Sequence, residues 1–286
     1  MRCIITLALT IILGQASPLI AEDLAQSPWN PSNIQTLRSV DKVAVANFVS
    51  QIAGTNGSSL EVKPRDIGDS SWFDLAGNEL YDLVLTLDSS GRGYFNVLAV
   101  YTQSSPGKIG LQNIEGWGIG ADLSKVVKDL NADGKYEFII LTQVAPGTLG
   151  GWYPTSRTPT WPAVYRLKDG KYIEASREFP AFYDTQVLPR LDKEITKASK
   201  EAVSAPEIQD SVAELMLEKD KILRVIGRDP TAGLQHAREW TNSEDPQLVQ
   251  CAIAVFADIG GHEEELHAAK NTMQAAMARQ HAAARE

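Results

Sequence analysis

The spacing of apolar residues divides the chain into a helical start, a β-rich middle and a helical end. Between residues 41 and 52 the apolar side chains fall mostly on one face of a helix, so we predict a packed helix there. From about residue 60 the apolar positions alternate or form short runs bounded by Gly, Ser or Asp, as is typical of strands. The predicted strands are 81–87, 94–102, 108–114, 136–144, 163–167 and 171–175, and Asp169-Gly170 forms a hairpin turn between the last two.

Helical periodicity returns after Phe182. Residues 208–226 predict a long amphipathic helix, whereas 184–195 has the mixed pattern of a connector. The pairs Asp229-Pro230 and Asp245-Pro246 each put a capping aspartate before a proline, which predicts the start of a short helix at each pair. The second of these helices is expected to end at Gly260-Gly261, before an alanine-rich helix over 263–284.

Two polar segments repeat one pattern 55 residues apart. Residues 74–84 align with residues 129–139 without a gap. In the second segment, oxygen-bearing residues alternate and a glycine stands at the sixth position, where a calcium loop needs a sharp turn. The segment supplies five or six of the about six to eight oxygens that calcium prefers. The predicted ligands are Asp129, Asn131, Asp133, the backbone carbonyl of Lys135, and Glu137.

The first segment is poorer in ligands. Ala76 stands where an oxygen donor is expected and Glu79 stands at the turn position, which leaves Asp74, Asn78 and Asp82. We therefore expect a structural turn there. For the second segment, the alternative is that the same side chains only accept hydrogen bonds from their own backbone, as in Asx turns.

The pattern Asp-x-Asn-x-Asp-Gly followed by an apolar strand resembles the FG-GAP or VCBS repeat of integrin-like propellers and of many secreted bacterial proteins. The resemblance covers residues 70 to about 176. The loop is not an EF-hand, because Ile140 stands at the twelfth position, where an EF-hand loop has a glutamate. The resemblance implies two antiparallel β-meander units of propeller-blade type. Together with the C-terminal helical domain that the periodicity predicts, the expected fold class is α+β. Two units are too few for a closed propeller, which has about four to eight. Residues 245–260 resemble one helix of a HEAT-type repeat, which implies a surface for a protein partner.

The N-terminus has the pattern of a signal peptide. A single charge, Arg2, precedes an apolar run over 4–13, and small residues permit cleavage after Ala21 or after Ala16. The run is too short to cross a bilayer as a helix, and no later stretch is long enough, so we expect a periplasmic or secreted protein without a transmembrane segment. The predicted regions are 1–21 signal peptide, 22–59 lead-in and helix, 60–195 β-rich domain and 205–286 helical domain, with a boundary near 195–205.

Charge and cysteine content narrow the partners. Asp and Glu outnumber Lys and Arg by 36 to 27, so nucleic acid is an unfavourable partner. After removal of the signal peptide, Cys251 is the single remaining cysteine, so no internal disulfide is expected. We predict that Cys251 packs as a small apolar residue in a helix.

The motifs do not predict catalysis. His262 and His267 are five positions apart, so they do not share a helix face as the pair of a zinc protease does. The sequence also contains neither a Gly-x-Ser-x-Gly elbow nor a phosphate-binding loop. Exposed loops often carry function, and residues 147–161 form a candidate binding loop through Trp152, Tyr153 and Trp161. The alternative is that these rings pin the loop to its own sheet.

We expect a secreted, non-catalytic binding protein with a structural calcium loop at 129–137 and a protein or carbohydrate partner. One competing hypothesis is a polysaccharide hydrolase, or its carbohydrate-binding accessory protein. A hydrolase would need two convergent carboxylates beside Trp152 or Trp161. Another hypothesis is that the β units hold no metal and that the helical domain is the only functional surface.

Overall fold

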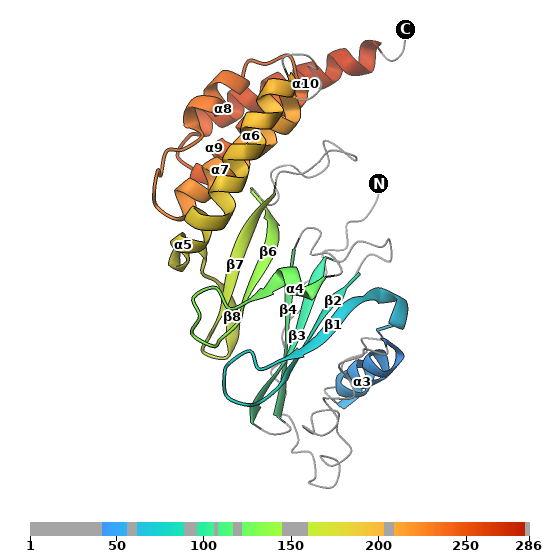
Figure 1. The fold of residues 1–286 in the computed structure, drawn as a ribbon. Helices are drawn as coiled ribbons and strands as arrows, with labels where there is room; N and C mark the ends of the chain where they lie inside the picture. The colour runs from blue at the N-terminus through green and yellow to red at the C-terminus, as the bar shows by residue number, and fades with distance from the viewer. Residues whose placement is uncertain are drawn as a thin grey trace.

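The computed structural model of the chain describes residues 42–55, 62–88, 96–105, 108–116, 122–144, 160–202 and 209–283. Over these ranges the chain forms two four-stranded antiparallel sheets with helices packed at both ends (Figure 1). This confirms the predicted α+β class. The predicted signal peptide and lead-in, residues 1–41, lie outside the described residues.

Each sheet is a meander in which consecutive strands are neighbours. Sheet A has the order β1 (Ile67–Phe73), β2 (Asp82–Leu87), β3 (Val97–Ser105) and β4 (Lys108–Glu115), and sheet B has the order β5 (Val127–Lys128), β6 (Glu137–Gln143), β7 (Thr160–Lys168) and β8 (Lys171–Glu174). Six of these strands coincide with the predicted ones. The two strands that were not predicted, β1 and β5, come directly before the two polar loops.

The sequence repeat is a repeat of structure. In sheet A, Phe73 at the end of β1 pairs with Asp82 at the start of β2. In sheet B, Lys128 at the end of β5 pairs with Glu137 at the start of β6, so the 55-residue offset is kept in the strand register. Each polar loop therefore joins the first two strands of its sheet.

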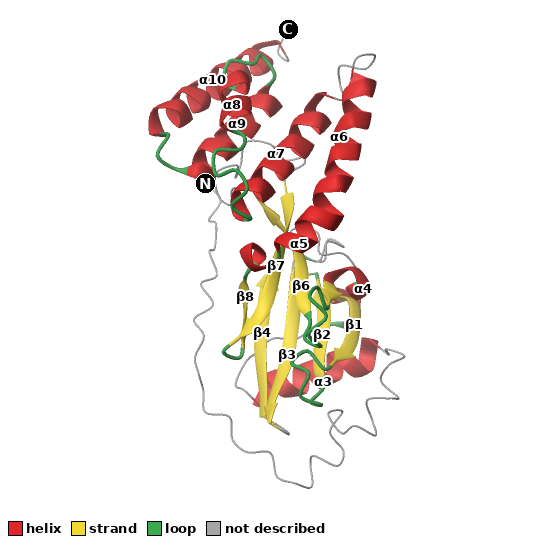
Figure 2. Cartoon of the chain, turned by 60° about the vertical axis from the view of Figure 1, so that its left-hand side comes forward, coloured by secondary structure: helices red, strands yellow, loops and turns green. Residues whose placement is uncertain are grey.

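The sheets pack against each other and bury apolar side chains between them. All six residues of β2 are buried, as expected for a strand that is covered on both faces. Val84 faces sheet B, whereas Leu83 and Leu85 pack with helix α3 (Lys42–Thr55), which crosses the other face of sheet A (Figure 2). The predicted helix at 41–52 is thus confirmed. The core between the sheets comprises Leu75, Val84, Leu98, Val100, Ile114, Leu123, Val126, Val127, Phe138, Ile140 and Tyr172, of which Leu123 and Val126 come from α4 (Leu123–Val126).

The remaining helices pack on sheet B and on one another, and they share a core with Trp161, Ala163 and Val164 of β7. They are α5 (Pro180–Phe182), α6 (Leu188–Ala202), α7 (Gln209–Val225), α8 (Leu234–Trp240), α9 (Pro246–Ile259) and α10 (Glu263–Ala283). Cys251 in α9 is 3% exposed, which confirms its predicted packing. No helix among the described residues is both long enough and apolar enough to cross a membrane.

The two Asp-Pro pairs differ. Asp245 caps α9 as predicted, because its carboxylate accepts the Gln247 N–H at 2.8 Å. The prediction for Asp229-Pro230 is wrong. Asp229 accepts the Thr231 N–H at 2.9 Å within a turn, and α8 begins only at Leu234, after Gly233 with φ of 90°.

The predicted connector over 184–195 is also wrong. A π-helical turn, Tyr183–Val187, leads directly into α6. Leu188, Leu191 and Ile195 have helical spacing, and Leu191 is fully buried against the helical core. Helical structure therefore begins before the predicted boundary at 195–205.

A glutamine joins the last strands of the two sheets. The Gln112 side chain in β4 donates to the Tyr172 carbonyl and accepts the Tyr172 N–H, both at 2.6 Å. One amide thus satisfies both backbone groups of a residue in β8.

Replacing Gln112 with Ala should destabilise the protein by about 1–3 kcal/mol, because two partly buried backbone groups of Tyr172 lose their partner. Urea unfolding measures the change, and Asn113→Ala, at an exposed position on the same strand, is the control. Equal unfolding midpoints for both variants would contradict this role.

Candidate functional site

The candidate site consists of the two polar loops, 74–81 between β1 and β2 and 129–136 between β5 and β6. The loops lie against each other. The Tyr136 N–H donates to the Leu75 carbonyl at 3.1 Å, and the rings of Phe73 and Tyr136 are 5.8 Å apart. The structure thus brings together two segments that are 55 residues apart in the sequence.

The second loop closes on its own carboxylates. Asp129 accepts the N–H groups of Asp133 and Gly134, one on each oxygen, at 3.1 and 3.0 Å. Asp133 accepts the Lys135 N–H at 2.9 Å, and Glu137 accepts the Leu130 N–H at 3.0 Å.

The first loop makes the same bonds at the same positions. Asp74 accepts the N–H groups of Asn78 and Glu79, both at 2.9 Å. Asn78 accepts the Leu80 N–H at 3.0 Å, and Asp82 accepts the Leu75 N–H at 3.3 Å. The first, fifth and ninth positions therefore hold both loops in shape.

The backbones match as well. The fourth positions, Gly77 and Ala132, have φ of 66° and 57°, and the sixth positions, Glu79 and Gly134, have φ of 64° and 79°. This left-handed conformation favours glycine, yet each loop has glycine at only one of the two positions. Glu79 and Ala132 therefore adopt a left-handed backbone without being glycine, and the side-chain hydrogen bonds of the loops stabilise that conformation.

The five predicted calcium ligands lie in one loop. Asp129, Asn131, Asp133 and Lys135 are exposed, whereas Glu137 is 2% exposed at the base of the loop. Asn131 donates to Asp133 at 3.0 Å and accepts the Asp133 N–H at 3.3 Å. The candidate ligand atoms of these residues are oxygens, and calcium prefers oxygen ligands. Over the described ranges, however, no group of three or more His, Cys, Asp or Glu side chains is arranged to hold a metal ion. Calcium binding therefore stays a prediction.

The pKa values of three loop carboxylates are shifted in different directions: that of Asp133 is lowered, and those of Glu137 and Asp82 are raised. The Lys135 N–H and the Asn131 side chain lower the pKa of Asp133. Burial raises the pKa of Glu137, although the Leu130 N–H opposes this effect, and the Asp133 and Asp129 charges raise it further. Burial raises the pKa of Asp82 to about 6 against the opposing N–H groups of Gln103 and Leu75. A cation beside Glu137 would favour its charged form.

The candidate binding loop is only partly described. Trp152 and Tyr153 lie outside the described residues. Trp161 is 5% exposed, its ring is stacked 6.5 Å from that of Tyr183, and the Lys221 Nζ lies 5.4 Å from its ring centroid. Trp161 is therefore not an exposed contact residue. Its ring lies in the core, as the alternative interpretation of this loop expects for a ring that packs.

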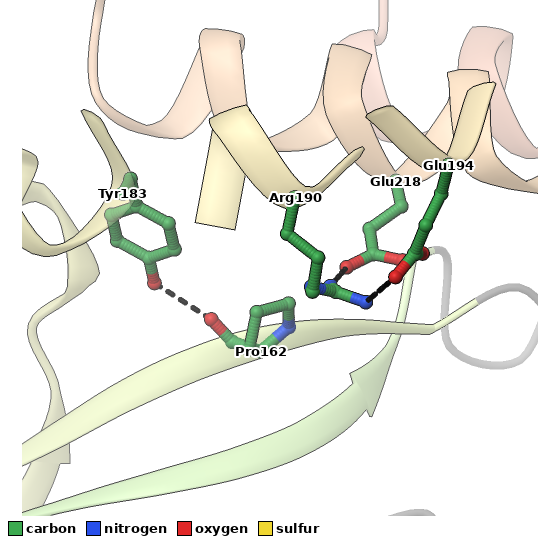
Figure 3. Close-up of polar contacts among 5 residues, drawn as sticks. All are labelled: Pro162, Tyr183, Arg190, Glu194 and Glu218. Carbon is green, nitrogen blue, oxygen red and sulfur yellow. Dashed lines mark hydrogen bonds and ion pairs between the residues drawn. The ribbon is translucent and has the colours of Figure 1, made fainter. Parts of the chain in front are cut away.

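Two carboxylates converge near this region (Figure 3). Arg190 of α6 donates to Glu194 at 3.2 Å and to Glu218 of α7 at 2.9 Å, while the Tyr183 hydroxyl donates to the Pro162 carbonyl at 2.7 Å. Because the guanidinium lies between the carboxylates, this cluster is an ion-pair network between helices. It does not provide the free carboxylate pair that the hydrolase hypothesis requires.

Sequence reasoning missed this cluster because Arg190 and Glu194 fall in the predicted connector. Their spacing of four residues, which is typical of ion pairs on one helix face, was the available signal. Burial raises the pKa of Glu218 to about 7 and the nearby Glu194 charge adds to this, although Arg190 opposes both.

Comparison of the chain with protein families, curated proteins and solved structures finds no match. The resemblance to FG-GAP or VCBS repeats thus rests on the loop residues and the strand that follows them.

Replacing Asp74 with Ala should destabilise the protein by roughly 1–2 kcal/mol without any cation, because the N–H groups of Asn78 and Glu79 lose their acceptor. Urea unfolding in a chelating buffer measures this loss. Asp74→Asn keeps one acceptor oxygen and should fall between Asp74→Ala and wild type. Wild-type stability of Asp74→Ala would show that these bonds do not hold the loop.

Glu218 should make stability fall as pH rises. Since its pKa is raised on folding, its stabilising contribution is complete below its unfolded pKa and is lost as pH rises through about 7. From pH 5 to pH 8 the wild type should lose roughly 2 kcal/mol relative to Glu218→Gln, which does not titrate.

Urea unfolding at both pH values makes this comparison. Glu194→Gln, on the same arginine but at a more exposed position, is the control. It should keep most of the wild-type pH dependence, because burial is the main cause of the raised pKa of Glu218 and the Glu194 charge only adds to it. If Glu218→Gln also keeps it, the titrating group is elsewhere.

Proposed function

We propose that the protein is a secreted, non-catalytic binding protein in which loop 129–137 holds a structural calcium ion. One observation carries the proposal. Both loops use the same carboxylate-to-backbone bonds, but only the second adds an oxygen donor at the third position, Asn131 in place of Ala76. It also has a carboxylate at the fifth position, Asp133 in place of Asn78. The first loop folds without these donors, so their presence in the second supports a ligand.

The ion would be held by oxygens of Asp129, Asn131, Asp133, Lys135 and Glu137. When bound, it would supply positive charge among ionised carboxylates and link the end of β5 to the start of β6. An ion that binds only the folded protein stabilises it by RT ln(1 + [Ca]/Kd). The role proposed for this loop is therefore structural.

The partner is proposed to be a protein or a carbohydrate. Helices α8, α9 and α10 pack side by side, as helical units that present a protein-binding surface do (Figure 2). Secretion to the periplasm or beyond rests on the signal pattern of residues 1–21, and the propeller-blade identity of the sheets rests on the loop residues. In the alternative form of the proposal, without metal, the helices still provide the partner-binding surface, but loop 129–137 holds no calcium ion.

Calcium titration of the chelated protein by calorimetry, with Asn131→Ala as the test variant, separates these forms. The wild type should bind calcium at one site and gain thermal stability. Asn131→Ala should bind at least about tenfold more weakly, because one ligand is lost.

The first loop supplies the rationale for this variant, since Ala76 occupies the equivalent position in a loop of the same shape. Asn131→Ala should therefore keep the wild-type melting temperature in chelator. The double variant Asp129→Ala, Asp133→Ala should lose the site altogether. Absence of heat and of any thermal shift in the wild type at millimolar calcium would reject the calcium role.

A further inference from the structure

Gly77 of the first loop lies against the backbone of the second loop. A Cβ atom added at Gly77 would be 3.1 Å from the carbonyl oxygen of Gly134. Such a contact is tighter than side chains normally accept, and the atom that would have to move belongs to the backbone. Gly134 stands between Asp133 and Lys135, two of the proposed ligands.

The second loop shows that the backbone conformation does not by itself require glycine at this position. Ala132 is the equivalent of Gly77 and has nearly the same φ, 57° against 66°. An alanine is therefore accommodated in this turn. What differs at Gly77 is the neighbouring loop, so the contact between the loops explains the glycine.

Two further contacts join the loops near this point, both of them at Tyr136. The Leu75 carbonyl accepts the N–H of Tyr136, and the Phe73 ring lies against the Tyr136 ring. Tyr136 stands between Lys135 and Glu137. The first loop thus touches the second at two residues, each of which lies between proposed ligands.

We infer that the first loop is a positioning surface for the calcium ligands of the second loop, with Gly77 as the positioning residue. The part that concerns calcium rests on the proposed function, whereas the positioning of the backbone does not. A methyl group at Gly77 would displace Gly134 by a few tenths of an ångström. Metal sites tolerate ligand distances within about 0.2 Å, so such a shift weakens binding.

The test compares Gly77→Ala with Gly170→Ala in the β7–β8 turn. Both glycines have positive φ, 66° and 76°, but a Cβ at Gly170 meets nothing within 4 Å. The control therefore also places an alanine at a positive φ, but without the contact. Two measurements are made on each full-length variant: amide hydrogen exchange of residues 130–137 in chelator, and calcium titration.

In chelator, Gly77→Ala should speed exchange of the Gly134 and Tyr136 amides at least about fivefold, whereas Gly170→Ala should leave them at the wild-type rate. The calcium affinity of Gly77→Ala should fall about tenfold. Wild-type exchange in Gly77→Ala overturns the inference, whether or not calcium binds. If the wild type takes up no calcium, the calcium role fails while the exchange comparison still decides the positioning.

Phe73→Leu is a second variant in case Gly77→Ala does not fold. It removes the ring contact with Tyr136 and leaves Gly77 unchanged. Faster exchange of the Tyr136 amide in this variant supports positioning by the first loop, and wild-type exchange in it rejects that role.

Discussion

The bond between a buried carboxylate and the backbone N–H of the second loop position determines how each sheet begins. Asp82 accepts the Leu75 N–H and also the Gln103 N–H at 2.7 Å, so it fixes its loop to β3 as well. Glu137 plays the corresponding role for Leu130. Burial of a carboxylate costs free energy, and the N–H groups offset that cost only if the chain takes one path. The first strand of each sheet is thereby held in register with the second.

The same constraint explains why the units stack. Once each loop is closed, β2 and β6 begin with buried residues on both faces, so each sheet needs a cover on either side. The inner faces cover each other. Helix α3 covers the outer face of sheet A, and the helices after Pro180 pack on sheet B. In repeat proteins, terminal caps shield the end of the stack, and these helices act in that way on two units.

The sequence was sufficient for elements with local signals. Strands bounded by turn residues, the amphipathic helix α7, the Asp-Pro start of helix α9, the alanine-rich helix α10 and the repeat of the polar loop were all predicted. Strand β1 was missed because polar residues interrupt its apolar pattern. One of these, Asp69, accepts the Leu123 N–H at 2.9 Å from 54 residues away. The burial of Trp161 and the pairing of Arg190 with Glu218 likewise depend on tertiary contacts. Within the candidate site, the ligand pattern was readable, but the contact of Gly77 with Gly134 was not.

In the described part of the chain, the edge of sheet B at β8 is covered by a side chain of sheet A and by the residues that follow β8, and not by another strand. Beside β8, the Gln112 amide occupies both backbone groups of Tyr172. Beyond β8, Ser176 accepts the Val164 N–H at 2.9 Å, Ala175 donates to the Val164 carbonyl at 2.8 Å, and Tyr183 donates to the carbonyl of Pro162, which has no N–H of its own. An open sheet edge invites a foreign strand, and these contacts use up the backbone groups that such a strand would need. Over these residues of β7 and β8, the protein is protected against edge-to-edge aggregation.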